Sequence, residues 1–319
     1  MSLSYLHYDV FTREALLGNQ LAVFTDARGI DAALMQAIAR EMNFAESTFI
    51  LPAEQAGTDV RMRIFTPFTE MPMAGHPTIG STFALAHDGV IKPGSDRFVF
   101  GLNIGPTPVD LEWSPPSREA LRRGLAEAPA EAGGSQLRFA WMTQLNPSFG
   151  PEVDARAAVA SAIGLVESDV DPRLPIQQVS CGLPFLFVPL RDRDTVDRAV
   201  SDAAGFRRLA AETGLALPIF MFAVLPRGAS ETVYSRMFAP DFGIVEDPAT
   251  GGASGPLGCY LVRHGVVTGE ATQRIVSLQG VAMGRASRVH VAIGGTPDAI
   301  TDVKVGGEAV LVGRGELIV

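Results

Sequence analysis

A helical spacing of apolar residues marks one segment near the start of the chain. Asp31 suits the N-cap position of a helix, and Asn43 suits its end. Between them, the apolar residues that fall on one helical stripe are Leu34, Ala37, Ile38 and Met42. The pattern therefore predicts one amphipathic helix that ends just before Glu46.

Most of the remaining chain has the pattern of short strands separated by glycine and proline. Residues 97–113 alternate apolar and polar side chains and contain Gly101, Gly105 and two prolines. This pattern predicts strands joined by tight turns. Residues 274–293 are rich in β-branched side chains and form the matching segment later in the chain.

A strand, a glycine-rich turn and a helix occur twice in the same order. The first copy reads RIFTP at residues 63–67 and GHPTIG at residues 75–80. The second reads RMFAP at residues 236–240 and EDPATGG at residues 246–252. We therefore predict an α/β (α+β) protein of two similar, pseudo-symmetric lobes.

Each predicted helix starts at a glycine, which matters chemically. The first turn of a helix has backbone N–H groups without intrahelical partners and carries a positive partial charge. Glycine lets the main chain approach a ligand closely, and an anion binds well at such a position. Two helix starts facing each other would form one anion-binding cleft between the lobes.

The region between the two copies changes composition. Residues 114–117 are rich in proline and serine, and residues 126–134 are rich in alanine, glycine and proline. We therefore predict an N-terminal lobe of residues 1–118 plus 300–319 and a C-terminal lobe of residues 119–299. In this arrangement the last strands of the chain would return to complete the first lobe.

Composition narrows the class of protein. The chain has 319 residues, 47% of them hydrophobic, which is enough for a large core. Its formal net charge of −9 argues against a nucleic-acid partner, because phosphate binding needs a basic face. The start of the chain does not resemble a signal peptide, and the apolar runs are too short to span a membrane. A cytoplasmic location is therefore expected.

The histidines and cysteines do not predict a metal site. The five histidines show no ligand spacing with Cys, Asp or Glu. Cys181 and Cys259 are expected to be free, buried thiols, because nothing indicates an oxidising compartment.

Glu46 follows the predicted helix and enters a strand-like run of residues 48–51. An apolar setting disfavours the charged form of a carboxyl group and raises its pKa, which suits a residue that transfers protons. A surface glutamate near a helix end would have the same sequence pattern. The position alone therefore leaves both readings open.

Four motifs in order resemble the phenazine-biosynthesis PhzF-like family, and the likeness extends over the whole chain. They are NFAES at residues 43–47, AGHPTIG at 74–80, SCGLP at 180–184 and EDPATG at 246–251. The resemblance implies the diaminopimelate-epimerase fold. In that fold each of two lobes is a strand barrel around a central helix, and the active site lies between the lobes.

The resemblance also implies a cofactor-free isomerase that acts on a small, anionic cyclic or amino-acid-like carboxylic acid. Glu46 would move the proton, while His76 and Asp247 would orient the substrate and hold its amino or hydroxyl group. A homodimer is expected as well. The residues implied to bind the substrate are Gly75, Gly251, Gly252 and Ser254.

One position departs from the family pattern. Gly252 stands where a serine is common, and Ser254 follows two positions later. Two other functions stay open: a racemase or epimerase of the same fold and a non-catalytic small-molecule binder. The racemase would need two acid/base groups, usually thiols, at the helix starts, where the sequence instead has His76 and Gly251.

Overall fold

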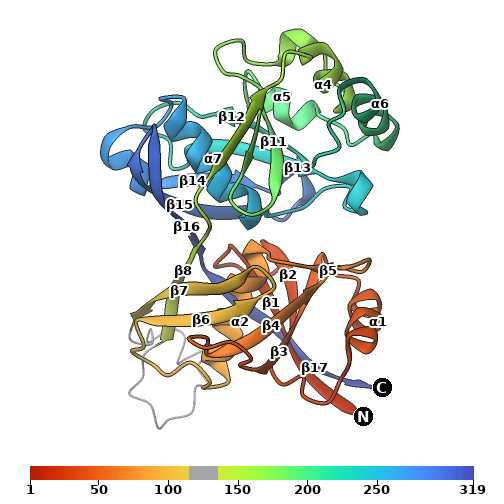
Figure 1. The fold of residues 1–319 in the computed structure, drawn as a ribbon, viewed down its shortest axis with the longest axis vertical. Helices are drawn as coiled ribbons and strands as arrows, with labels where there is room; N and C mark the ends of the chain where they lie inside the picture. The colour runs from red at the N-terminus through yellow and green to blue at the C-terminus, as the bar shows by residue number, and fades with distance from the viewer. Residues whose placement is uncertain (115–135) are drawn as a thin grey trace. The chain divides into compact units, whose positions relative to one another are not determined.

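The computed structural model of the chain describes residues 1–114 and 136–319. Their contacts divide them into two compact units (Figure 1). Unit 1 contains Met1–Leu16, Gln20–Thr143 and Gly306–Val319, and unit 2 contains Leu17–Asn19 and Gln144–Val305. No described helix is long and apolar enough to cross a membrane.

Unit 1 is a ladder of strands around one helix. Its strands are β1 (Ser2–Val10), β2 (Asn19–Phe24), β3 (Glu46–Pro52), β4 (Val60–Phe65), β5 (Glu70–Met71), β6 (Arg97–Leu102), β7 (Gly105–Ser114), β8 (Gln136–Thr143) and β17 (Ala309–Ile318). They pair in the order β17, β1, β2, β3, β4, β6, β7 and β8. The pairs β2–β3 and β4–β6 are parallel. Both parallel pairs need crossover connections, and the second is made by helix α2 (Gly75–His87).

Helix α2 lies at the centre of unit 1 and contacts β1, β3, β8 and β17 (Figure 1). Its residues from Gly75 to Leu85 are all buried. A helix that is buried all round presents mostly small or apolar side chains, and its sequence GHPTIGSTFALAH does so apart from the buried His76. Gly80 allows the closest approach, because a Cβ there would lie 2.6 Å from Leu21 Cδ2 and 2.7 Å from Val10 Cγ2.

Helix α1 (Ala32–Met42) confirms the predicted early helix. The Asp31 side chain caps it by accepting a hydrogen bond from the Leu34 N–H, and Asn43 ends it in the left-handed conformation with φ of 50°. The predicted apolar stripe was partly wrong, because Ala37 is exposed. The fully buried face consists of Met35, Ile38 and Ala39.

Unit 2 repeats the same plan with additional helices. Its strands are β9 (Ser148–Glu152), β10 (Gln177–Ser180), β11 (Pro184–Pro189), β12 (Ile219–Val224), β13 (Val233–Phe238), β14 (Ile275–Gln279), β15 (Ser287–Thr296) and most of β16 (Ala299–Gly307). Its helices are α4 (Arg156–Ala162), α5 (Arg193–Arg198), α6 (Ala203–Thr213) and α7 (Gly251–Arg263), with short 3-10 turns η1 (Glu167–Asp169), η2 (Pro240–Phe242), η3 (Gly269–Gln273) and η4 (Val281–Met283). Helix α7 is the buried central helix, and it contacts β10, β11 and β15.

The strand ladders of the two units match pair by pair. In unit 2, β11–β12 and β13–β14 are parallel, as β2–β3 and β4–β6 are in unit 1. The antiparallel pairs β12–β13 and β14–β15 correspond to β3–β4 and β6–β7. The predicted duplication is therefore confirmed as two copies of one mixed α+β unit.

An ion pair is also duplicated, and it lies just before each central helix. Arg63 of β4 pairs with Glu70 at 2.6 Å, and Arg236 of β13 pairs with Glu246 at 2.8 Å. Each arginine also covers a phenylalanine two residues later, with the guanidinium carbon 5.1 Å from the Phe65 ring and 4.8 Å from the Phe238 ring. Each pair fixes the segment between a strand and the helix that follows it.

The last strand returns to the first. β17 pairs antiparallel with β1 from Ser2↔Ile318 to Val10↔Ala309, so the end of the chain belongs to unit 1. β8 also groups with unit 1. The predicted boundary between residues 118 and 119 lies outside the described residues and stays a prediction.

Replacing Gly80 by alanine tests the packing of α2. The added Cβ would meet Leu21 and Val10 at less than 3 Å, so Gly80→Ala is expected to lower the free energy of unfolding by about 1–3 kcal/mol. The matched control is Gly252→Ala in α7, where a Cβ would meet only Phe185 Cζ at 4.0 Å. The control should be neutral or stabilising, because alanine favours helix. Equal effects of both variants in urea denaturation would contradict this packing.

Candidate active site

Glu46 and His76 meet in unit 1. Glu46 is the first residue of β3, and His76 is the second residue of α2. The distance from Glu46 Oε2 to His76 Nδ1 is 3.1 Å, and the two side chains are 12% and 4% exposed. The predicted strand entry for Glu46 is confirmed, and the glutamate is partly buried against a polar partner rather than free on the surface.

The His76 imidazole is held in its neutral form. Burial lowers the pKa of His76 to about 3, against an opposing effect from a hydrogen bond with the backbone of Gln20. With a neutral ring, the contact with Glu46 is a close polar contact and not a pair of full charges. Because Glu46 Oε2 faces Nδ1, the tautomer that donates to the carboxylate carries its hydrogen on Nδ1.

Asp247 lies in unit 2 at the centre of a buried polar network. Its Oδ1 accepts a hydrogen bond from Asn19 Nδ2 at 2.7 Å, and its Oδ2 accepts one from the Thr250 hydroxyl at 2.6 Å. Burial raises the pKa of Asp247 to about 6, while the hydrogen bonds from Thr250 and Asn19 oppose this rise. The carboxylate therefore has little contact with water but accepts hydrogen bonds from two side chains.

Three members of this network were missed by reasoning from the sequence: Asn19, Thr250 and Gln279. Asn19 belongs to the segment 17–19 that groups with unit 2, and Gln279 ends β14. Gln279 has no local pattern that distinguishes it from an ordinary polar residue. Asn19, in the GNQLAV segment at residues 18–23, and Thr250, in the EDPATGG motif, had a sequence signal.

The two central helices begin without a side-chain cap. The N-cap residues are Ala74 for α2 and Thr250 for α7; Ala74 has no polar side chain, and Thr250 directs its hydroxyl to Asp247 instead. Neither helix has an acidic residue in its first turn. The helix starts at Gly75 and Gly251 therefore keep the positive character that favours an anion.

Gly252 leaves open space beside the first turn of α7. A Cβ built at this position would have one neighbour within 4 Å, Phe185 Cζ at 4.0 Å, among the residues that the structure describes. A Cβ would therefore fit here without a clash with the described residues.

Ser254 has a partner inside its own helix. Its buried hydroxyl donates to the Thr250 carbonyl at 2.9 Å. Thr78 of α2 does the same with the Ala74 carbonyl at 2.7 Å, so this bond is another duplicated feature. The geometry favours a role for Ser254 in the helix itself, although the sequence grouped it with the substrate-binding residues.

The two units differ at the predicted site positions. In the strand registers, Ser47 pairs with Phe65 and Ile219 pairs with Phe238, so Glu46 of unit 1 corresponds to Pro218 of unit 2. Proline has no group that can transfer a proton. Gly252 likewise holds the place in α7 that His76 holds in α2, as the second residue of the helix. The copy in unit 2 therefore lacks both members of the Glu46–His76 pair.

The two cysteines do not have the arrangement of a two-thiol racemase. Both are buried in unit 2, with their Sγ atoms 3.9 Å apart, and both are free thiols as predicted. The hydrogen bond with Cys181, followed by burial, raises the pKa of the Cys259 thiol. Thiols of this kind are poor proton carriers at neutral pH.

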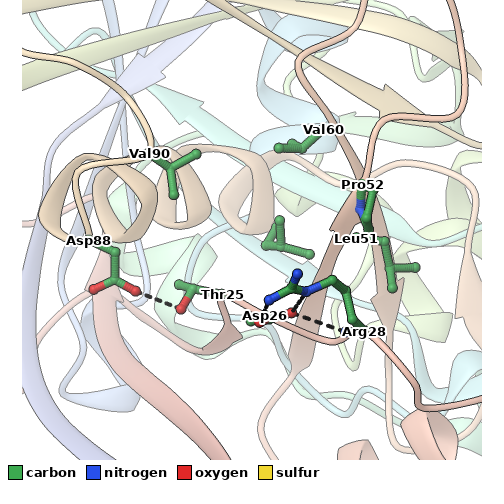
Figure 2. Close-up of a pocket in the computed structure, with 9 residues that line it drawn as sticks. Thr25, Asp26, Arg28, Leu51, Pro52, Val60, Asp88 and Val90 are labelled. Atoms are coloured by element: carbon green, nitrogen blue, oxygen red, sulfur yellow. Dashed lines mark hydrogen bonds and ion pairs between the residues drawn. The ribbon is translucent and has the colours of Figure 1, made fainter.

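A separate pocket of about 430 Å³ lies in unit 1 and is lined by other residues (Figure 2). Its charged groups are already paired: Arg28 binds Asp26 at 2.6 Å, and Asp88 accepts from the Thr25 hydroxyl at 2.6 Å. The predicted site residues lie outside its lining, so we assign it no part in the chemistry.

Comparison with known proteins identifies the family. The sequence profile described as phenazine biosynthesis-like protein (PhzC-PhzF) matches residues 8–315. The chain belongs to this family. Among relatives, it is 34% identical over 316 residues to the trans-2,3-dihydro-3-hydroxyanthranilate isomerase of Pseudomonas fluorescens, with 99% of each chain covered. It is 32% identical over 320 residues to an uncharacterized isomerase of Mesorhizobium japonicum, again with 99% of each chain covered.

Solved structures show the same fold. The phenazine biosynthesis protein of the PhzF family from Bacillus anthracis is 26% identical, with a TM-score of 0.82 and full coverage of both chains. A probable proline racemase from Agrobacterium radiobacter has a TM-score of 0.65 at 11% identity, and the match covers 99% of this chain and 93% of that one. The chain therefore shares its fold with a racemase as well. This member of the phenazine biosynthesis-like family is thus an enzyme of the isomerase class with a mixed α+β fold.

The protonation of His76 can be measured directly. Because burial lowers its pKa to about 3, its ring should stay neutral between about pH 5 and pH 8, where an exposed histidine changes charge. ¹⁵N NMR of imidazole-labelled protein, with His76→Gln to assign the signal, should show one nitrogen protonated and one not across this range. A His76 signal that titrates near pH 6.5 would contradict the neutral, hydrogen-bonded ring.

Proposed function

We propose that this protein is a cofactor-independent isomerase in which Glu46 moves a proton between carbon atoms of a small carboxylic acid. The observation that carries the proposal is the buried contact between Glu46 and His76, together with its absence from the equivalent positions Pro218 and Gly252. One proton carrier suits an isomerase that removes and returns a proton on one face of its substrate. A racemase with two bases would need a second carrier.

The proposed reaction has two proton transfers. The Glu46 carboxylate removes a proton from one carbon, and the electron pair of that C–H bond moves into the conjugated system of the substrate. Glu46 then gives the proton to another carbon, which forms the new C–H bond and restores the carboxylate. His76 would keep Glu46 oriented through the contact at 3.1 Å, and a neutral imidazole would do so without holding the carboxylate as a permanent ion pair.

The other predicted residues would bind the substrate. Each uncapped helix start, at Gly75 in unit 1 and at Gly251 in unit 2, offers N–H groups and positive dipole to an anionic group, which supports an anionic substrate. The Asp247 carboxylate would accept a hydrogen bond from an amino or hydroxyl group, as its donors Asn19 and Thr250 leave it further lone pairs.

The names of two relatives support a proposal for the substrate class. Relatives from Pseudomonas fluorescens and Pseudomonas aeruginosa are named trans-2,3-dihydro-3-hydroxyanthranilate isomerases, and we propose a related cyclic or amino-acid-like carboxylate for this enzyme.

We also propose a cytoplasmic homodimer. Light scattering after size-exclusion chromatography tests the dimer, and a mass near the 33.8 kDa of one chain would rule it out.

Replacing Glu46 by glutamine removes the proposed proton carrier while keeping its shape. The substitution should lower isomerisation by about 10²–10⁴-fold, the usual contribution of general acid–base catalysis. The measurement is NMR in deuterated buffer with trans-2,3-dihydro-3-hydroxyanthranilate and a panel of cyclic amino and hydroxy acids, which reports both turnover and deuterium incorporation.

The matched control for this experiment is Glu41→Gln, the same substitution at an exposed position of α1. It should leave turnover unchanged. Exchange that survives in Glu46→Gln would reject Glu46 as the carrier, and a wild-type protein that binds the acids without exchange would favour the non-catalytic binder.

Gly252→Ser tests how the open space beside α7 shapes substrate choice. The serine side chain fits, with Phe185 Cζ at 4.0 Å from its Cβ, and adds one hydroxyl near the start of α7. If the hydroxyl makes one hydrogen bond to the substrate of the Pseudomonas relatives, kcat/KM for that compound should rise about tenfold. Gly252→Ala should not give this rise. A fall in kcat/KM with both variants would instead mean that the wild-type substrate occupies the open space.

A further inference from the structure

The side chain of Gln279 holds the turn between Asp247 and α7. Its Nε2 donates to the Asp247 carbonyl at 2.7 Å and to Thr250 Oγ1 at 2.9 Å, and its Oε1 accepts from the Thr250 N–H at 3.0 Å. Gln279 is fully buried. A backbone N–H can only donate and a carbonyl can only accept, so these two groups decide which way the amide points.

The amide in turn decides the direction of the Thr250 hydroxyl. A hydroxyl can donate or accept, but Thr250 Oγ1 already accepts from Gln279 Nε2. Its own hydrogen is therefore directed to the other close oxygen, Asp247 Oδ2 at 2.6 Å. Thr250 is 8% exposed, so water has little access to compete for this hydrogen.

Asp247 thus faces a donor at each carboxylate oxygen. Asn19 Nδ2 donates to Asp247 Oδ1, and it also donates to the Ala249 carbonyl at 3.0 Å. Donors on both oxygens favour the ionised carboxylate, whereas burial opposes it. The nearby charge is Glu246, and this carboxylate is paired with Arg236 at 2.8 Å. The hydrogen bonds are therefore what opposes the effect of burial on Asp247.

We propose that Gln279 is a positioning residue: by fixing the Thr250 hydroxyl as a donor, it keeps Asp247 ionised and oriented to accept a hydrogen bond from an amino or hydroxyl group of the substrate. The proposal rests on the proposed function in that it takes Asp247 as a substrate-binding residue. The series of hydrogen bonds from Gln279 through Thr250 to Asp247 does not depend on which compound is bound.

The decisive experiment is a ¹³C NMR titration of the Asp247 carboxyl carbon in the full-length protein. Thr250→Val removes the hydroxyl, and Gln279→Met removes the amide at similar volume. Both should raise the midpoint of the Asp247 titration by about one pH unit or more, a tenfold change in its protonation equilibrium. Thr250→Ser keeps the hydroxyl and should restore a midpoint close to that of the wild type.

Gln273→Met is the matched control, because Gln273 also donates to a backbone carbonyl of unit 2, that of Ile293, without belonging to the Asp247 network. It should leave the midpoint unchanged. A wild-type midpoint in folded Gln279→Met would overturn the proposal. If Gln279→Met does not fold, the comparison of Thr250→Val with Thr250→Ser decides, and equal midpoints in these two would overturn it.

The pH profile of kcat/KM connects the titration to catalysis. In Gln279→Met and Thr250→Val the acidic limb should move to higher pH by the same amount as the NMR midpoint, whereas a purely structural loss would lower the whole profile. An unmoved limb would overturn the positioning role. Absence of turnover in the wild type would instead count against the proposed function. The NMR titration would still test the hydrogen bonds from Gln279 through Thr250 to Asp247.

Discussion

Burial of one helix at the centre of each unit is the constraint on which the rest of the structure depends. Strands pack against α2 and α7, so their faces carry small residues such as Gly80 and Gly258, whose absent side chains admit neighbouring strands. A helix surrounded in this way has few places for polar contacts other than its ends. The candidate chemistry is accordingly found at the two helix starts, where N–H groups and positive dipole lie beside Glu46 in one unit and Asp247 in the other.

Duplication supplied two equivalent frameworks, and the polar residues have diverged between them. The shared features are structural: the arginine–glutamate pairs before each helix and the back-bonded hydroxyls of Thr78 and Ser254. The features that differ are chemical, since unit 1 has Glu46 and His76 while unit 2 has the network around Asp247. The polar residues singled out in the sequence therefore lie in different surroundings in the two copies, an acid beside a neutral imidazole in unit 1 and a buried carboxylate with its own donors in unit 2.

Local patterns in the sequence were enough to predict much of this fold. The cap at Asp31, the strand entry at Glu46 and the helix starts at Gly75 and Gly251 depend on residues close together in the chain. The partners of Asp247 could not be predicted in this way, because Asn19 and Gln279 reach it from distant segments. The exposure of Ala37 and the internal bond of Ser254 were missed for a related reason: helical spacing does not show how a helix is turned against its neighbours.

The central claim is that Glu46 alone carries the proton, and the fate of the transferred hydrogen tests it most directly. The measurement is a single turnover in D₂O of a protium-containing substrate, with mass spectrometry and NMR of the product. Because the Glu46 side chain is only 12% exposed, exchange with solvent should compete with return, and part of the product should keep the original hydrogen at its new carbon. Retention of the original hydrogen at an unchanged rate in Glu46→Gln would contradict this account, because another group would then carry the proton.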